Sequence, residues 1–143
     1  NSIVYAPEIT ISPVKQSARR AFAMAGLKPA DIELLSLYDC YPITVIITLE
    51  DAGFCAKGEG GCFVADNDLT YRGDFPCNTH GGQLSMGQAS FAGGMSHIIE
   101  VVRQLRGEAG ERQVARNRLA FVNGNGGVMS TESSLILGRA EDE

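Results

Sequence analysis

The chain has 143 residues, of which 44% are hydrophobic and 20% charged, and its formal net charge at pH 7 is −5. These values describe one ordinary globular domain that buries about two-thirds of its unfolded surface. The negative charge argues against nucleic acid or an anionic membrane surface as the main partner, and the lack of any run of about 18 apolar residues argues against a membrane span.

The start of the chain and its cysteines indicate where the protein works. The first ten residues, NSIVYAPEIT, lack the basic segment followed by an apolar one that marks a secretory signal. They also lack an initial Met, so we expect residues 1–143 to be a single domain cut from a longer chain. The cysteines are widely and irregularly spaced, with no C-x-x-C pair, which predicts no metal site and free thiols in a reducing cytoplasm. They are Cys40, Cys55, Cys62 and Cys77.

The first third of the chain predicts two helices around a buried strand. Ser12 suits a helix N-cap, Pro13 the first helical position and Gly26 a left-handed helix end, so a helix is expected between them. The apolar run in residues 32–39 predicts a buried strand. Residues 42–53 predict a second helix, whose Ile, Val and Leu positions cover most of its circumference and indicate burial on more than one side.

The rest of the chain predicts a long loop, a helix and a hairpin. Residues 53–94 hold more than half of the 17 glycines, which is typical of a functional loop. Residues 95–106 predict an amphipathic helix that Gly107 ends. Its expected apolar face consists of Met95, Ile98, Ile99, Val102 and Leu105. Residues 118–127 and 132–139 predict paired strands, so the fold class is α/β: a mixed sheet covered by layers of helices.

Three polar or glycine-rich clusters fall where predicted strands and helices meet. They are YDCY at 38–41, NTHGG to GQ at 78–88, and NGNGG at 123–127. Because such edges line the ligand crevice of an open α/β sheet, we expect the three clusters to converge on one site.

These clusters resemble motifs of the thiolase family. NTHGG, four residues, then GQASFAGG is similar to the thiolase C-terminal signature Asn-x-x-Gly-Gly, four residues, then Gly-His-Pro-x-Gly-Ala-x-Gly. The segment AFAMAGLKPADIELLSLYDCY resembles the helix and strand that lead into Asn-Glu-Ala-Phe, and YDCY is closer to the His-Asp-Cys-Phe of the lipid-transfer-protein branch (sterol carrier protein type). RGEAGERQVARNRLAFVNGNGG resembles the helix end, turn and strand that follow. The resemblance covers nearly the whole chain and implies the C-terminal half of a layered thiolase-like fold.

The resemblance implies chemistry on CoA thioesters, of the acetyl-CoA acetyltransferase type, with the CoA thioester as substrate and no further cofactor. In this family a cysteine nucleophile is acylated, a second cysteine moves a proton at the α-carbon, and a histidine helps to hold the oxyanion. The nucleophile belongs to the N-terminal half, so we expect this chain alone to be inactive. The resemblance also implies a homodimer or a tetramer and a small OB-fold partner protein.

The family's catalytic side chains are replaced at the matching positions. Gln88 stands in place of the signature His, and Asn123 in place of the proton-transferring Cys. Tyr38 occupies the position of the Asn or His that assists the oxyanion. Gln88 can still donate through its amide, whereas Asn123 cannot transfer a proton. Tyr38 is therefore the candidate acid–base group, as in members of the lipid-transfer branch that are aldol lyases of β-hydroxyacyl-CoA.

Several further residues are candidates for the same site. His80, in the glycine turn, is a fourth catalytic candidate beside the alternative of a local hydrogen-bonding role. Asp39 could bind a loop backbone group or orient a catalyst. Cys40 is expected to be a core residue, and His97 a packed or partly exposed one. Four glycines either only form turns or also let the backbone approach the substrate closely, and they are candidates for substrate binding. They are Gly81, Gly82, Gly126 and Gly127. Three functions stay open: acyl transfer, aldol cleavage that uses the tyrosine, and non-catalytic binding of an acyl-CoA or lipid.

Overall fold

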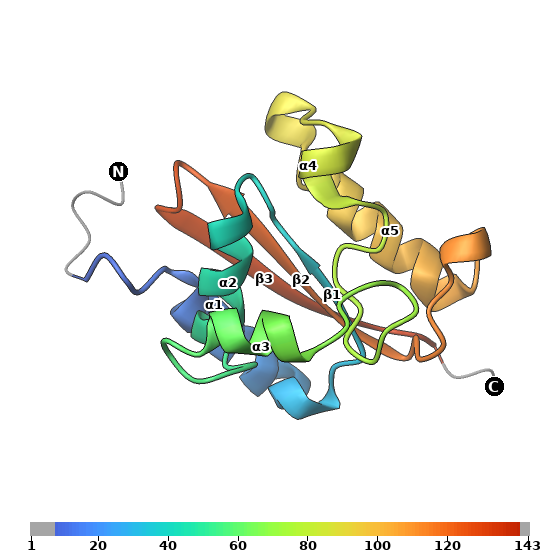
Figure 1. Cartoon of the computed structure of the whole chain (residues 1–143), viewed down its shortest axis with the longest axis horizontal. Coiled ribbons are helices and arrows are strands. Elements are labelled where there is room, and N and C mark those ends of the chain that lie inside the picture. Colours follow the sequence, from blue (N-terminus) through green and yellow to red (C-terminus); the bar gives the residue numbers. More distant parts are fainter. Residues whose placement is uncertain (1–7, 141–143) are drawn as a thin grey trace.

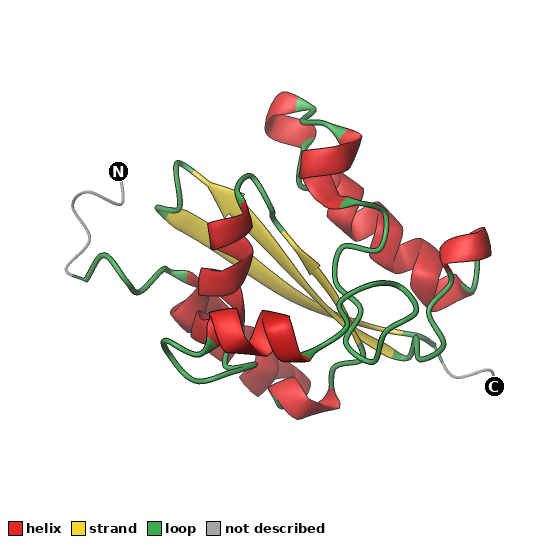
Figure 2. Cartoon of the chain, viewed as in Figure 1, coloured by secondary structure: helices red, strands yellow, loops and turns green. Residues whose placement is uncertain are grey.

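The computed structural model describes residues 8–140, which form a three-stranded mixed sheet (Figures 1 and 2). Its strands are β1 (Leu34–Leu37), β2 (Leu119–Gly126) and β3 (Thr131–Gly138), in the order β1-β2-β3. β1 pairs with β2 in parallel, and β2 pairs with β3 as an antiparallel hairpin. The predicted mixed sheet and hairpin are confirmed.

Helices cover both faces of the sheet (Figure 1). One face carries α1 (Val14–Ala25), α2 (Pro42–Asp51) and α3 (Gly60–Asp66), and the other carries α5 (Met95–Arg106). Because side chains alternate along a strand, each face has its own core. Leu35, Leu37 and Phe121 belong to the core under α1 and α2. Leu34, Ala120 and Val122 belong to the core under α5.

The start of α1 differs from the prediction. Pro13 occupies the N-cap, and no side chain caps the helix. The Ser12 hydroxyl and backbone N–H instead both donate to the Asp51 carboxylate at the end of α2, each at 2.7 Å. The serine therefore joins two helices instead of capping one. Gly26 ends the helix with φ 67°, as expected.

The aliphatic residues of α2 predict burial on more than one side, but the fully buried positions of this helix are partly polar. Thr44, Thr48 and Leu49 are buried, whereas Ile43 is 56% exposed. The Thr44 hydroxyl contacts the backbone oxygens of Tyr38 and Tyr41, at 3.0 and 2.7 Å. This polar contact ties the start of α2 to the segment that follows β1.

The predicted loop 53–94 contains three short helical elements. They are α3, α4 (Gly82–Met86) and the 3₁₀ turn η3 (Ser90–Ala92). Each is too short to show a helical period, which is why the pattern predicted irregular structure. Between α3 and α4 the chain runs beside β1: the Leu35 N–H donates to the Pro76 oxygen at 2.9 Å, and the Asn78 N–H donates to the Leu35 oxygen at 3.0 Å. The second half of the segment is therefore fastened to the sheet.

The helix α5 buries polar residues that sequence periodicity did not select. His97, Glu100 and Gln104 are buried beside Val101 and Leu105, whereas Met95 and Ile99 of the predicted apolar face are about half exposed. The buried polar groups have hydrogen-bond partners on α5 itself and on the segments beside it. Glu100 accepts hydrogen bonds from Thr79, Gln104 and Arg112. Gly107 ends the helix with φ 72°, as predicted.

Candidate functional site

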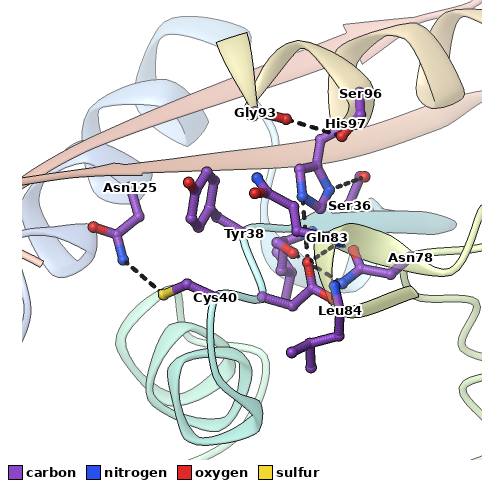
Figure 3. A network of polar contacts seen from close by, with 12 residues as sticks. Ser36, Tyr38, Cys40, Asn78, Gln83, Leu84, Gly93, Ser96, His97 and Asn125 are labelled. Atoms are coloured by element: carbon purple, nitrogen blue, oxygen red, sulfur yellow. Dashed lines mark hydrogen bonds and ion pairs between the residues drawn. The ribbon is translucent and has the colours of Figure 1, made fainter. Parts of the chain in front are cut away.

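A cavity of about 780 Å³ lies at the carboxyl end of β1, between the start of α2, the segment around η3 and the β2–β3 hairpin. This is the edge at which open α/β sheets bind ligands. Its lining includes Tyr38, Cys40, Gln88, Phe91, Asn125 and the hairpin residues Gly126 to Met129. Figure 3 shows the Tyr38 ring with Cys40 and Asn125 on one side and Gln83 and His97 on the other.

Tyr38 and Gln88 meet in this cavity, as predicted. The Gln88 Nε2 donates to the Tyr38 hydroxyl oxygen at 2.8 Å and to the Ser90 backbone oxygen at 3.1 Å. Because a carbonyl oxygen can only accept, the Ser90 contact fixes which end of the amide is the nitrogen. The tyrosine oxygen therefore receives an N–H, and its own proton is free for a group in the cavity.

This hydrogen bond has a geometric consequence. It leaves the Tyr38 O–H facing the cavity, where it can form a hydrogen bond with a ligand. No imidazole lines the cavity within the described residues; Tyr38, Cys40 and Tyr41 do, and Tyr38 is the one that Gln88 contacts, which makes it the candidate proton carrier.

Asp39 connects the segment that follows β1 to the start of α4. The buried carboxylate accepts the backbone N–H of Gln83 at 2.7 Å and that of Leu84, more weakly, at 3.4 Å. It thereby connects the residue after Tyr38 to the first turn of α4, which leads to Gln88. A Cβ at Gly82 would lie 2.0 Å from Asp39 Oδ2, so this close approach requires glycine. Of the two roles considered for Asp39, the structure shows the backbone contact.

The two histidines lie behind the cavity, with ring centroids 5.2 Å apart. His97 is fully buried; its Nδ1 pairs with Ser36 Oγ at 2.8 Å, and its Nε2 lies 3.5 Å from Asp39 Oδ1. Burial, with His80 nearby, lowers the pKa of His97 to about 4, so the ring is neutral at pH 7. Burial also lowers the pKa of His80, and neither of its ring nitrogens has a hydrogen-bond partner among the described residues. The structure shows that His97 is packed and not partly exposed, and it does not bring His80 to the cavity.

Asn123 also lies outside the cavity, so the expectation that it converges with Tyr38 and Gln88 is wrong. Its buried side chain donates to Glu132 Oε2 and to the Ser133 backbone oxygen, both at 3.2 Å. The contact belongs to the hairpin, because Glu132 and Ser133 lie on β3, where they pair with Asn125 and Gly124 of β2. Burial raises the pKa of Glu132 to about 7.

Asn125 lines the cavity instead, and the sequence analysis missed it. Its Nδ2 lies 3.7 Å from the Cys40 Sγ, so Cys40 also faces the cavity instead of the core. The motif NGNGG could have indicated this residue. Residues two apart on a strand lie on the same side of the sheet, and Asn125 is the one nearer the end of the strand, where the cavity lies.

The predicted binding glycines divide into two pairs. Gly126 and Gly127 line the cavity, at a hairpin tip where Gly127, Val128 and Met129 all have φ between 55° and 58°. Gly81 and Gly82 do not line it: they begin α4, where the second packs against Asp39. Their glycine identity is explained by this packing and by φ values of 99° and 62°.

The layered α/β fold and the glycine-lined cavity at the carboxyl end of β1 define the class: an α/β domain with a cavity at the edge of its mixed sheet. The family is shown by comparison with known proteins. The chain belongs to the thiolase C-terminal domain-like family, whose model matches residues 1–139. The resemblance seen in the motifs is therefore confirmed.

The chain is similar to three known proteins in particular. An acetyl-CoA acetyltransferase of Methanothermobacter thermautotrophicus is 41% identical over 129 residues, which are 90% of this chain and 34% of that protein. Sterol carrier protein 2 of Bos taurus is 40% identical over 107 residues, which are 75% of this chain and 20% of that protein. A solved structure of an Ltp2–ChsH2(DUF35) aldolase has a TM-score of 0.81 and 38% identity, and the match covers 94% of this chain and 34% of that chain. The chain thus spans about a third or less of each of these proteins.

No helix among residues 8–140 combines the length and apolar character needed to cross a bilayer.

Proposed function

We propose that this chain is the C-terminal domain of a longer thiolase-like enzyme that cleaves a carbon–carbon bond in a β-hydroxyacyl-CoA by an aldol mechanism. The observation that carries the proposal is the 2.8 Å hydrogen bond from the Gln88 amide to the Tyr38 hydroxyl in the cavity. It provides a proton carrier where the family signature has lost its histidine and cysteine. The likeness to an aldolase structure at 38% identity supports the same chemistry.

The proposed reaction begins at the substrate's β-hydroxyl group. The Tyr38 oxygen, which the Gln88 N–H contacts at 2.8 Å, acts as the general base and removes the hydroxyl proton. The electron pair of that O–H bond forms a carbonyl at the β-carbon, the bond between the α- and β-carbons breaks, and its electrons pass to the thioester as an enolate. Tyr38 then returns the proton to the α-carbon, directly or through water. The products are a ketone or aldehyde and a shortened acyl-CoA, so atoms and charge balance.

Acyl transfer of the acetyl-CoA acetyltransferase type is the second candidate. The 41% identity to such an enzyme favours it. In that case a cysteine outside this chain would be acylated, and Tyr38 would serve the proton transfer at the α-carbon. A third candidate, binding of an acyl-CoA or lipid without turnover, follows from the lost catalysts and the likeness to sterol carrier protein 2.

The setting of the enzyme is part of the proposal. We infer a cytoplasmic homodimer with the CoA thioester as substrate and no other cofactor. A small OB-fold protein is the proposed partner, since the similar solved structure is an aldolase in which Ltp2 is named together with ChsH2(DUF35).

One pair of assays on the full-length protein separates the three candidates. Release of a ketone or aldehyde from a β-hydroxyacyl-CoA, without thiolysis of acetoacetyl-CoA by CoA, is the expected result. Thiolysis alone would establish acyl transfer and overturn the aldol proposal. Failure of both reactions, with retained binding of CoA esters, would establish a binding protein. The purified 143-residue chain should show background turnover in both assays.

A further inference from the structure

Gly93 lies at the contact between two glutamine side chains, in the position that the family signature leaves open. The residue is buried, and its φ of −53° is available to any amino acid. Backbone conformation therefore does not require glycine here. The neighbouring side chains do: a Cβ at Gly93 would lie 2.4 Å from Gln88 Oε1 and 2.9 Å from Gln83 Oε1. Gly94, the next residue, would meet nothing within 4 Å.

We propose that Gly93 is a positioning residue for Tyr38, because its missing side chain makes the space in which the Gln88 carboxamide lies. The inference rests on the proposed function of Tyr38. The Gln88 nitrogen is fixed by Tyr38 and by the Ser90 oxygen, and the Gln88 oxygen lies against Gly93. These contacts hold an otherwise exposed side chain in the one orientation that donates to the tyrosine.

The size of the expected displacement follows from the distances. Ordinary contact with a Cβ begins at 3.4 Å, so the Gln88 oxygen would have to move by about 1.0 Å from its 2.4 Å position (3.4 minus 2.4). Gln83 closes the inner side, since it is only 6% exposed and its oxygen would itself meet the new Cβ. The Gln88 amide must therefore move outward. A 2.8 Å hydrogen bond that lengthens by about 1 Å no longer qualifies as one.

A double-mutant cycle in the full-length enzyme tests whether Gly93 acts through Gln88. Gly93→Ala should lower kcat about 10-fold with little change in KM, and Gln88→Ala should do the same, because a single exposed neutral donor contributes less than a buried oxyanion donor. In the Gln88→Ala background, Gly93→Ala should cost no more than about twofold further, since the clashing oxygen is gone. Gly61→Ala, where a Cβ meets nothing within 4 Å, is the matched control and should leave kcat unchanged.

A spectroscopic measurement on the full-length protein makes the test independent of turnover. The ¹³Cζ shift of labelled Tyr38 at pH 7 reports the hydrogen bond from Gln88. Gly93→Ala should shift this resonance as Gln88→Ala does, with the rest of the spectrum preserved. An unchanged Tyr38 resonance would overturn the inference. So would effects on kcat that are independent for the two variants, or a loss of the folded state caused by Gly93→Ala both with and without Gln88. If Tyr38→Phe leaves turnover intact, the proposed function fails, while the resonance still decides the role of Gly93.

Discussion

Replacing Asp39 tests how the site is held together. Asp39→Ala removes a buried carboxylate that accepts the Gln83 N–H at 2.7 Å. A hydrogen bond to a charged acceptor contributes about 1.5–3 kcal/mol, and the buried N–H left unpaired adds to the loss. Including the small cavity, we expect the free energy of unfolding to fall by about 3–4 kcal/mol. Asp39→Asn keeps one acceptor oxygen and the shape, so it should cost about 1 kcal/mol.

Urea unfolding of the 143-residue chain at pH 7 measures both losses. The control is Asp31→Ala, because Asp31 accepts the Lys28 backbone N–H at a similar 2.8 Å but in an exposed turn. It should cost less than half as much as Asp39→Ala. Equal losses at the two positions would refute the reasoning that burial and the clamp on α4 make Asp39 important.

Three further predictions concern buried groups near the site. Glu132→Gln should raise the free energy of unfolding at pH 8 by about 1–3 kcal/mol and change it little at pH 4 in urea titrations. The folded-state pKa of Glu132, about 7, lies above the ordinary 4.5, so the stability present below pH 4.5 is lost as the pH rises through 7. Equal effects of the substitution at both pH values would disprove this. The His97 ring should show no NMR titration between pH 5.5 and 8, because its folded-state pKa is about 4. The stability that the neutral ring contributes is present above pH 6.5 and is lost only as the pH falls toward 4. A titration midpoint near 6.5 would contradict the burial of the ring. Gly82→Ala should lower the free energy of unfolding, measured in urea, by about 2–4 kcal/mol, because the new Cβ would lie 2.0 Å from Asp39 and the residue has a φ of 62°. A loss no larger than that caused by Gly61→Ala would count against the close contact.

The parts of the fold that depend on local signals could be predicted from the sequence. Gly26 and Gly107 end their helices because a left-handed residue there needs no Cβ. The two C-terminal strands pair across a short glycine-rich bend, and the buried β1 follows from its apolar run. These features need only neighbours along the chain, so pattern and propensity suffice to find them.

The features that depend on contacts with residues distant in the sequence could not be predicted. The inner face of α5 is polar because Thr79, Ser36 and Asp39 lie beneath it, and no periodicity of apolar residues reports such partners. In the same way, the choice between Asn123 and Asn125 depends on where β2 ends relative to the cavity. The meeting of Tyr38 and Gln88, 50 residues apart, was expected from the thiolase resemblance and not from their own neighbourhoods.

The central claim is that the Tyr38 hydroxyl moves the proton, and turnover of Tyr38→Phe in the full-length enzyme tests it most directly. The substitution removes one oxygen and leaves the ring, so the fold should be preserved. With a β-hydroxyacyl-CoA as substrate and the shortened acyl-CoA measured by mass spectrometry, kcat should fall about 10²–10⁴-fold while KM stays within a few-fold. A kcat within about threefold of the unsubstituted enzyme would show that another group carries the proton and would contradict the account.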